Sequence, residues 1–222
     1  MLVRPSELPR HLVGRGQAVQ AKTARQTTLS RMSRPDWPLE DLWLELSPMW
    51  PGISIEWLPQ IDSTNSELMR RARLGHTEAV LLVAEQQTAG RGRLGRAWIT
   101  PEGSALTFSL GLPLNPQSWS GLSLAVGVAL VEALDPEGAC GLGLKWPNDL
   151  WHWPPGAEPG KVGGILIETL QPPGMSEGRY VVAGVGVNLA LGPSDPNVKW
   201  WVDNITNPVG QLFLRLLLMT VV

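Results

Sequence analysis

The stretch that decides the fold is residues 162–189, which read VGGILIETLQPPGMSEGRYVVAGVGVNL. Val162–Leu170 and Tyr180–Leu189 are both rich in apolar residues, as buried strands are. The segment between them is short, contains Pro and Gly, and shows no helical pattern. Two strands therefore follow one another without a helix between them, which argues against repeated βαβ units.

The rest of the chain mixes strand and helix patterns. Ile53–Trp57 alternates apolar and polar residues, and Ala79–Ala84 is a continuous apolar run, so we expect strands there. Ser118–Leu134 repeats its apolar residues at helical spacing and predicts a helix. We expect further strands at 104–112 and 142–146, helices at 39–46 and 209–219, and loops at 86–96 and 151–160. The whole predicts an α+β fold in which helices flank a mixed β-sheet.

One further helix has clear end signals. Ser63 or Thr64 is placed to cap it, and it runs through Leu74 to a stop at Gly75. Glu67 is placed to complete a capping box at its start.

Composition limits the class of protein. A chain of 222 residues with 43% hydrophobic and 17% charged residues can bury a core. The single Cys140 excludes an internal disulfide and fits a reducing compartment, so we expect a cytoplasmic protein. With one thiol, and with His11, His76 and His152 far apart, the sequence argues against zinc. No apolar run reaches the roughly 18 residues of a transmembrane helix, so we expect no membrane partner.

The charges are unevenly distributed. Residues 1–35 hold seven basic side chains and one acidic one, which leaves 11 basic and 19 acidic residues in the remainder. An acidic body repels a phosphate backbone, so DNA or RNA binding by the folded part is disfavoured. Residues 1–37 lack sustained periodicity and predict a flexible basic leader. Their composition loosely resembles an organelle transit peptide, but a disordered leader or an over-long gene start is the favoured interpretation.

Residues 89–98, AGRGRLGRAW, are the first segment suited to chemistry. The glycines allow the backbone to approach a ligand closely, and the arginine forks match phosphate and carboxylate oxygens. Trp98 could stack on a flat heterocycle. Taken alone, the segment is equally consistent with a solvated basic loop or an RNA-binding RGG-like segment.

Three more segments carry weaker signals. Lys145–Asp149, KWPND, is a turn that could hold Mg²⁺ or orient a hydroxyl, although many surface turns contain Asn-Asp. Lys161–Glu168 places an ammonium at the start of a strand whose two glycines suggest a close approach to its backbone, and an ordinary strand with a surface lysine is the alternative. Ala183–Asn188 is a glycine-punctuated strand, and it is not a dinucleotide fingerprint because no helix follows.

In this order, the segments resemble the biotin–protein ligase family over roughly residues 53–190. The matching pieces are IDSTN at 61–65, AEQQ at 84–87, GRGRLGR at 90–96 with Trp98, KWPND at 145–149, GGILIE at 163–168 and GVGVN at 184–188. The resemblance implies a fold related to the catalytic domains of class II aminoacyl-tRNA synthetases and lipoate ligases. It also implies an enzyme that activates biotin with ATP and attaches it to a lysine of a carrier protein.

The resemblance further implies which residues form the site. Those implied to bind biotin are Ser63, Thr64, Asn65, Gln87, Arg91, Gly92, Arg93 and Lys161. Those implied to bind ATP are Arg96, Trp98, Asn148, Asp149 and Asn188, with Trp98 stacked on adenine. Lys161 and Arg93 are the implied catalytic residues, and Lys161 would reach the biotin carboxylate and the α-phosphate.

Elementary chemistry agrees with this reaction. Joining a carboxylate to a triphosphate brings anions together, so the site must supply positive charge, which Mg²⁺ bound with ATP and the Arg and Lys side chains would provide. A neutral lysine of the carrier can then attack the activated acyl group without a protein nucleophile. The partner implied is the biotin carboxyl carrier protein of acetyl-CoA carboxylase.

The chain departs from the family pattern in several places. No winged-helix pattern precedes residue 50, so we expect no DNA-binding repressor domain and a monofunctional ligase. The 151–160 loop is long, and Gly160 stands where a basic residue is common. We divide the chain into the leader (1–37), a catalytic domain (38–208) and a helix (209–222) that would lead to a C-terminal β-barrel, which we expect to be missing.

Three alternatives stay open. The chain could be a truncated, impaired remnant that binds biotin without turnover. It could be a lipoate or octanoyl ligase-like enzyme of the same superfold, although GRGRLGR together with KWPND speaks against that. A nucleic-acid-binding module is the weakest candidate, since only the leader and one loop are basic.

Overall fold

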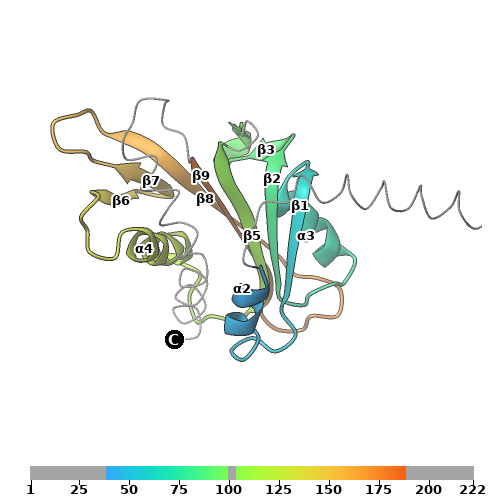
Figure 1. Ribbon diagram of the computed structural model, residues 1–222. Helices are drawn as coiled ribbons and strands as arrows, with labels where there is room; N and C mark the ends of the chain where they lie inside the picture. The colour runs from blue at the N-terminus through green and yellow to red at the C-terminus, as the bar shows by residue number, and fades with distance from the viewer. Residues whose placement is uncertain (1–38, 100–103, 189–222) are drawn as a thin grey trace, which may run out of the picture. The chain divides into compact units, whose positions relative to one another are not determined.

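A computed structural model describes residues 39–99 and 104–188. In chain order the elements are α2 (Leu39–Leu46), β1 (Ser54–Ile61), α3 (Thr64–Arg73), β2 (Val80–Gln87), β3 (Gly90–Arg91), the 3₁₀ turn η1 (Arg93–Gly95), β4 (Ala97–Trp98), β5 (Ala105–Leu114), α4 (Leu122–Leu134), β6 (Leu142–Lys145), β7 (Asp149–His152), β8 (Gly160–Leu170) and β9 (Arg179–Asn188). This is the α+β arrangement that the sequence predicts (Figure 1).

The described strands form a mixed seven-stranded sheet in the order β1-β2-β5-β9-β8-β7-β6. Only β1 and β2 run parallel within it, and the other neighbours are antiparallel. The predicted strands at 162–170 and 180–189 are β8 and β9, which pair from Gly163 with Val187 to Leu170 with Tyr180. Their short linker is the reason that they are antiparallel neighbours.

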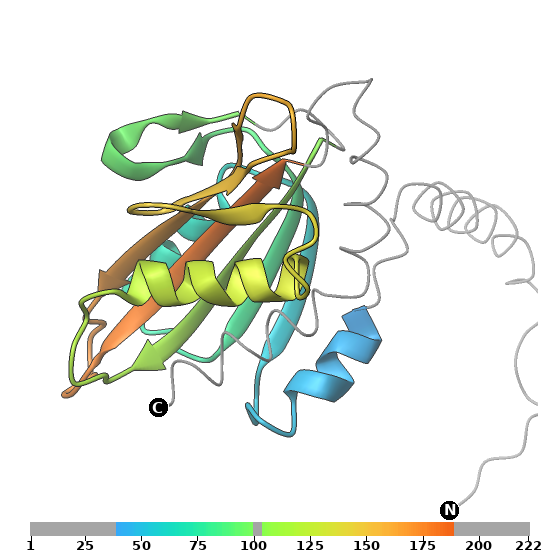
Figure 2. The same cartoon turned by 90° about the vertical axis from the view of Figure 1, so that its left-hand side faces the viewer.

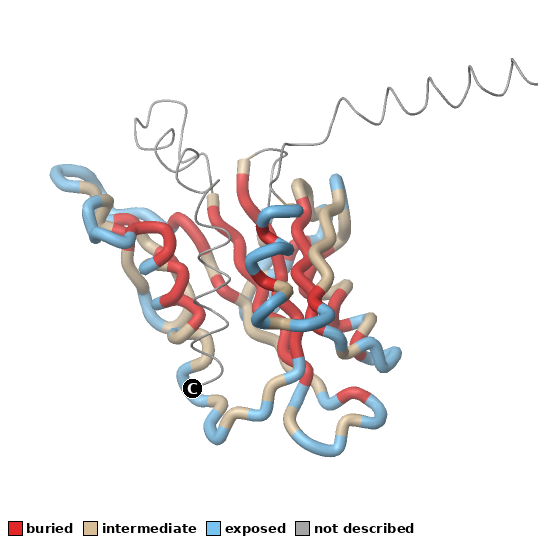
Figure 3. The backbone as a smooth tube through the Cα atoms, turned by 60° about the horizontal axis from the view of Figure 1, so that its bottom comes forward, coloured by how far each residue is buried: buried red, intermediate tan, exposed pale blue. Residues whose placement is uncertain are grey.

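Helices cover both faces of the sheet. α3 contacts β2, β5, β8 and β9, whereas α4 contacts β6, β7 and β8. Figure 2 shows α4 across the near face, with α3 behind the sheet. The core on the α3 side consists of Leu68, Met69, Ala72, Val80, Leu82, Tyr180 and Val182. Figure 3 shows that buried backbone is concentrated in the central strands, and that the connecting loops are mostly exposed.

The start of α3 differs from the prediction in one respect. Ser63 is the N-cap and accepts a hydrogen bond from the backbone N–H of Ser66. The predicted capping box is wrong, because the N–H of Ser63 donates to Asp62 and the carboxylate of Glu67 pairs with Arg70 and Arg71. Gly75 follows the helix with φ of 91°, as its role as a stop requires.

Three other boundaries also differ. The predicted 151–160 loop contains the end of β7, a strand of the sheet in which Leu150 and His152 are buried. The predicted 86–96 loop instead begins with the end of β2 and forms the β3–β4 hairpin around η1. The helix predicted from residue 118 begins at Leu122, after Gly121 in the left-handed conformation. The leader, the helix at 209–219 and the proposed domain ends lie outside the described residues.

Two kinds of feature are absent from the described residues. No described helix has both the length and the apolar character needed to span a bilayer. Nor do the described His, Cys, Asp and Glu side chains form a group of three that could hold a metal ion.

Candidate functional site

A cavity of about 350 Å³ lies at the N-terminal end of α3, bordered by β8, β9 and the β3–β4 hairpin. Its size falls in the usual range for small-molecule sites. The predicted site residues that line it are Ser63, Thr64, Asn65, Gln87, Arg91, Gly92, Arg93, Arg96, Trp98, Asn148, Asp149 and Lys161. Asn188 is not among the lining residues; it pairs with Ala105 at the end of β9. Five separate segments of sequence thus meet around one cavity.

Glycines of β9 bring the site residues against the sheet. A Cβ atom at Gly184 would overlap with the side-chain amide of Asn65. A Cβ atom at Gly186 would lie 2.6 Å from the indole ring of Trp98, closer than real Cβ contacts. The glycine punctuation of this strand therefore allows an α3 side chain and a β4 side chain to rest directly on its backbone.

A buried hydrogen-bond network organises the end of α3. Thr64 donates its backbone N–H to the side-chain oxygen of Gln87 at 2.8 Å. The hydroxyl of Ser109, fully buried on β5, lies 2.7 Å from the Thr64 hydroxyl and 2.6 Å from the Asn65 side-chain oxygen. One hydroxyl hydrogen can serve only one acceptor, and the Thr64 hydroxyl also lies 3.2 Å from the side-chain oxygen of Gln87. The two shorter contacts are both satisfied when Thr64 donates to Ser109 and Ser109 donates to Asn65. Sequence reasoning missed Ser109, because nothing in the local pattern of β5 distinguishes it.

This network leaves specific polar groups for a ligand. The side-chain oxygen of Gln87 accepts a hydrogen bond from the backbone N–H of Thr64, and this fixes which end of the Gln87 amide is Nε2. The Nε2 group has no hydrogen-bond partner among the described residues. The hydroxyl hydrogen of Ser63 is also available, since its oxygen acts as acceptor in the helix cap. The cavity therefore offers hydrogen-bond donors suited to a carbonyl oxygen.

The cationic side chains of the cavity have defined contacts. Lys161 Nζ lies 2.7 Å from Asp149 Oδ1, and Arg91 Nη2 lies 2.8 Å from Glu168 Oε2. Arg93 Nη1 donates to the side-chain oxygen of Asn148 at 3.2 Å. Asn148 is itself fixed, because its Nδ2 donates to the backbone oxygen of Ile165 at 2.8 Å.

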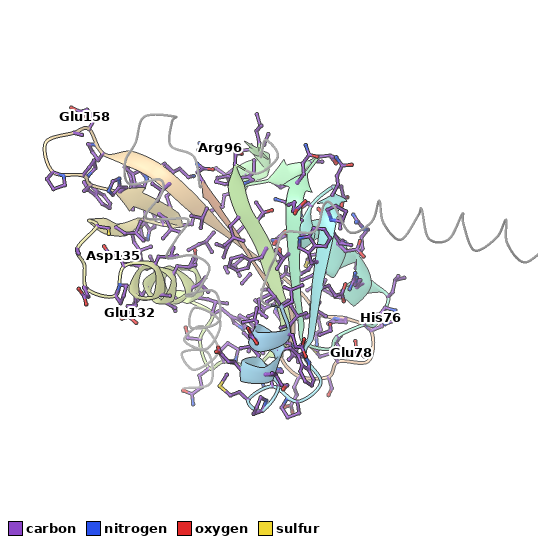
Figure 4. The ribbon with its side chains drawn as sticks, in the orientation of Figure 1. His76, Glu78, Arg96, Glu132, Asp135 and Glu158 are labelled. Atoms are coloured by element: carbon purple, nitrogen blue, oxygen red, sulfur yellow. The ribbon has the colours of Figure 1, made fainter. Side chains whose placement is uncertain are left out.

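Arg96 completes the cationic set at the rim. Figure 4 shows it beside β3, at the end of the sheet opposite to Glu78. Arg91, Arg93, Arg96 and Lys161 face a single carboxylate, Asp149, among the lining residues. This excess of positive charge favours anionic ligands such as carboxylates and phosphates.

The indole ring of Trp98 lies against Gly186 of β9 and near the ammonium of Lys161. Lys161 Nζ is 5.9 Å from the centroid of its ring, within the range of a cation–π contact. The indole Nε1 is buried and has no hydrogen-bond partner among the described residues. The ring thus presents a flat apolar surface to the cavity, and its indole N–H donates no hydrogen bond within the described residues.

An ion-pair network anchors the outer face of α3. Arg70 bridges Asp62 and Glu67 at 2.6 Å each, and Arg71 bridges Glu56 and Glu67 at 2.8 Å each. Hydrogen bonding to Arg70 lowers the pKa of the Asp62 carboxyl below its ordinary value, and Arg71 does the same for the pKa of Glu67. These charges lie outside the cavity, so they contribute to the position of α3 rather than to ligand contact.

The comparisons with known proteins point to one family. A family model described as the biotin/lipoate A/B protein ligase family matches residues 57–188. The biotin–[acetyl-CoA-carboxylase] ligase of Mycobacterium tuberculosis is 38% identical over 174 residues, 74% of this chain and 60% of that protein. The bifunctional ligase/repressor BirA of Escherichia coli is 39% identical over 143 residues, 63% of this chain and 42% of that protein. The chain thus spans between 42% and 60% of the length of these two relatives.

Solved structures are similar as well. The biotin protein ligase of Leishmania major, solved with biotinyl-5-AMP, superposes with a TM-score of 0.54 at 26% identity and covers 75% of this chain and 74% of its own. The biotin protein ligase of Aquifex aeolicus, solved with biotin and ATP, gives a TM-score of 0.51 at 29% identity over 76% of this chain and 68% of its own.

Proposed function

We propose, from the premise that the chain belongs to the biotin/lipoate A/B protein ligase family, that it is an ATP-dependent biotin–protein ligase. One observation supports this most strongly. The side chains that the family resemblance implies for biotin and for ATP line a single cavity, apart from Asn188. Relatives of 38% and 40% identity are named biotin–[acetyl-CoA-carboxylase] ligases, and this favours biotin over lipoate as the acid.

The proposed first step joins biotin to AMP. A carboxylate oxygen of biotin attacks the α-phosphorus of ATP, the bond between the α-phosphorus and its bridging oxygen breaks, and pyrophosphate leaves. Negative charge accumulates between the two reactants, so Lys161 and Arg93 act as the catalytic cations by stabilising it. Lys161 is poised for this at the cavity, where it now neutralises Asp149 at 2.7 Å.

The proposed second step moves biotin to the carrier. The neutral ε-amine of a carrier lysine attacks the acyl carbon, the carbon–oxygen bond to the phosphate breaks, AMP leaves, and the amine loses a proton to solvent. The hairpin that carries Arg91, Gly92 and Arg93 borders the cavity and would shield the mixed anhydride from water. The biotin carboxyl carrier protein of acetyl-CoA carboxylase is the partner that we propose.

Within the cavity, we divide the roles between two groups of side chains. Ser63, Thr64, Asn65 and Gln87 line the cavity together, and the donors left on Ser63 and Gln87 suit the ureido oxygen of biotin. Trp98 lines the same cavity together with Arg96, Asn148 and Asp149, which are implied for ATP. Asn188 is implied for ATP as well, but it lies at the end of β9 and does not line the cavity. A flat indole wall next to guanidinium groups suits an adenine ring and its phosphates.

Magnesium would accompany ATP. Mg²⁺ prefers oxygen ligands and is commonly held by one or two carboxylates together with substrate phosphates. Asp149, the carboxylate among the cavity-lining residues, fits that requirement, with Asn148 beside it as an amide oxygen donor. When bound there, the ion would supply positive charge to the triphosphate.

We also propose that the partner is a protein rather than DNA, and that the compartment is the cytoplasm. The acidic remainder of the sequence favours a protein rather than a DNA partner. A lone free thiol, Cys140, fits the reducing cytoplasm.

A pyrophosphate-release assay tests the function. Purified chain with ATP, Mg²⁺ and biotin should release pyrophosphate and retain biotinyl-adenylate through gel filtration, and lipoate or octanoate in place of biotin should give far less. Release with lipoate but not with biotin would favour the lipoate ligase alternative. Biotin binding by calorimetry without any pyrophosphate release would instead support an impaired remnant.

A further inference from the structure

Glu168 is a charged residue beside the cavity that does not line it. It lies on β8, and its side chain is 23% exposed. Its carboxylate accepts hydrogen bonds from two residues that do line the cavity. Arg91 Nη2 lies 3.0 Å from Oε1 and 2.8 Å from Oε2, and Asn65 Nδ2 lies 2.9 Å from Oε2.

The contact with Arg91 fixes most of a guanidinium group. Its Nε donates to the hydroxyl of Ser66 on α3 at 3.1 Å, and its Nη2 donates to Glu168 on β8. Its Nη1 has no partner among the described residues, which leaves two hydrogens for a ligand. Two elements of the scaffold therefore hold the Arg91 side chain, which is still 43% exposed.

The contact with Asn65 ties Glu168 to the buried network. Asn65 donates one amide hydrogen to the backbone oxygen of Leu166 and the other to Glu168, and its oxygen accepts from Ser109. All of its amide hydrogens are therefore used within the protein. A continuous series of hydrogen bonds thus runs from Gln87 through Thr64 and Ser109 to Asn65. From Asn65 it continues to the carboxylate of Glu168, which also binds Arg91.

We propose that Glu168 is a positioning residue, which fixes the guanidinium of Arg91 for the anionic ligand through its contacts with Arg91 and Asn65. This inference rests on the proposed function. A long side chain that is held in place before binding loses less conformational freedom when the ligand arrives. Glu168 thus improves the binding of an acid although it carries the same sign of charge.

That sign makes the inference testable. If Glu168 influenced the site only through its charge, Glu168→Gln would remove a negative group near an anionic ligand, and biotin would bind more tightly. If Glu168 acts by holding Arg91, the same substitution should weaken biotin binding by about tenfold, as expected for the loss of a charge-assisted hydrogen bond at a partly exposed site.

Isothermal titration with biotin distinguishes these outcomes. The matched control is Glu56→Gln, which breaks the 2.8 Å ion pair of Glu56 with Arg71. Neither residue lines the cavity, so biotin affinity should be unchanged. Unchanged or tighter binding by Glu168→Gln would overturn the inference. Failure of the wild-type chain to bind biotin would overturn the proposed function as well, and so the two failures are distinguishable.

A double-mutant cycle separates positioning from a general structural role. Because Glu168 is proposed to act through Arg91, Glu168→Gln should cause little further loss of biotin affinity once Arg91→Gln is present. Additive losses would contradict the proposal. If Glu168→Gln does not fold by circular dichroism, Ser66→Ala gives the second test, since it removes the other hold on Arg91 and should weaken biotin binding in the same direction. Unaltered binding in that variant would also count against the inference.

Discussion

Replacing Lys161 with alanine should slow the first chemical step. Its ammonium borders the cavity and forms a 2.7 Å ion pair with Asp149. A unit charge about 4 Å from an anion contributes roughly 4 kcal/mol at an effective dielectric constant near 20. The side chain is 40% exposed and already paired with Asp149, so we halve this figure to about 2 kcal/mol. That corresponds to a roughly thirtyfold slower adenylation.

The ion pair adds a second expectation. In Lys161→Ala the carboxylate of Asp149 would lose its partner and repel the incoming phosphates. The double variant Lys161→Ala/Asp149→Asn should therefore recover part of the lost rate, when it is assayed at saturating Mg²⁺ to offset the loss of the proposed Mg²⁺ ligand.

Single-turnover kinetics measure the effect. Chain in excess over radiolabelled ATP, with biotin present, gives the adenylation rate, and pre-formed biotinyl-adenylate with a carrier domain gives the transfer rate. Lys145→Ala is the matched control, because Lys145 stacks on Trp151 at 3.6 Å and does not line the cavity. An adenylation rate within twofold of wild type in Lys161→Ala, or an equal loss in Lys145→Ala, would refute the reasoning.

Further predictions concern the hairpin, the buried network and the acid limit of stability. Arg93→Ala should let biotinyl-adenylate dissociate faster, seen as lost retention on gel filtration, and equal retention would remove Arg93 from the proposed role. Ser109→Ala should lower the free energy of unfolding by about 1–3 kcal/mol in urea titrations, because it leaves the buried oxygen of Asn65 without its donor; an unchanged urea midpoint would contradict the network. Asp62 has a lowered folded pKa, so its pair with Arg70 stabilises the fold above the ordinary value of 3.8 and is lost as pH falls through the folded pKa. Asp62→Asn should thus be less stable than wild type at neutral pH, by under about 1 kcal/mol for so exposed a pair, and equal to it in acid; a difference that persisted in acid would show another cause.

Local signals carried much of the fold. The ends of α3 could be predicted because its N-cap and its glycine stop both lie within one segment of sequence. β8 and β9 could be predicted because long apolar runs are separated by a linker too short for a helix. β7 could not, because a four-residue strand that runs into Pro and Gly resembles a loop until its partners on β6 and β8 are known.

Some site residues could likewise be predicted from local sequence, and others could not. The glycine- and arginine-rich segments are distinctive by themselves, so their residues could be named in advance, and the structure brings all but Asn188 around one cavity. Ser109 and Glu168 could not be assigned, because each depends on Asn65, which lies 44 and 103 residues away along the chain. Hydrogen bonds between distant segments leave no periodic trace in a sequence.

Oxygen-isotope tracing tests the central claim most directly. Biotin labelled with ¹⁸O in its carboxylate is supplied with ATP, Mg²⁺ and a carrier domain, and the products are analysed by mass spectrometry. If the carboxylate attacks the α-phosphorus, each AMP released after transfer carries one ¹⁸O atom and pyrophosphate carries none. Biotinylated carrier accompanied by unlabelled AMP, or label found in pyrophosphate, would contradict the account.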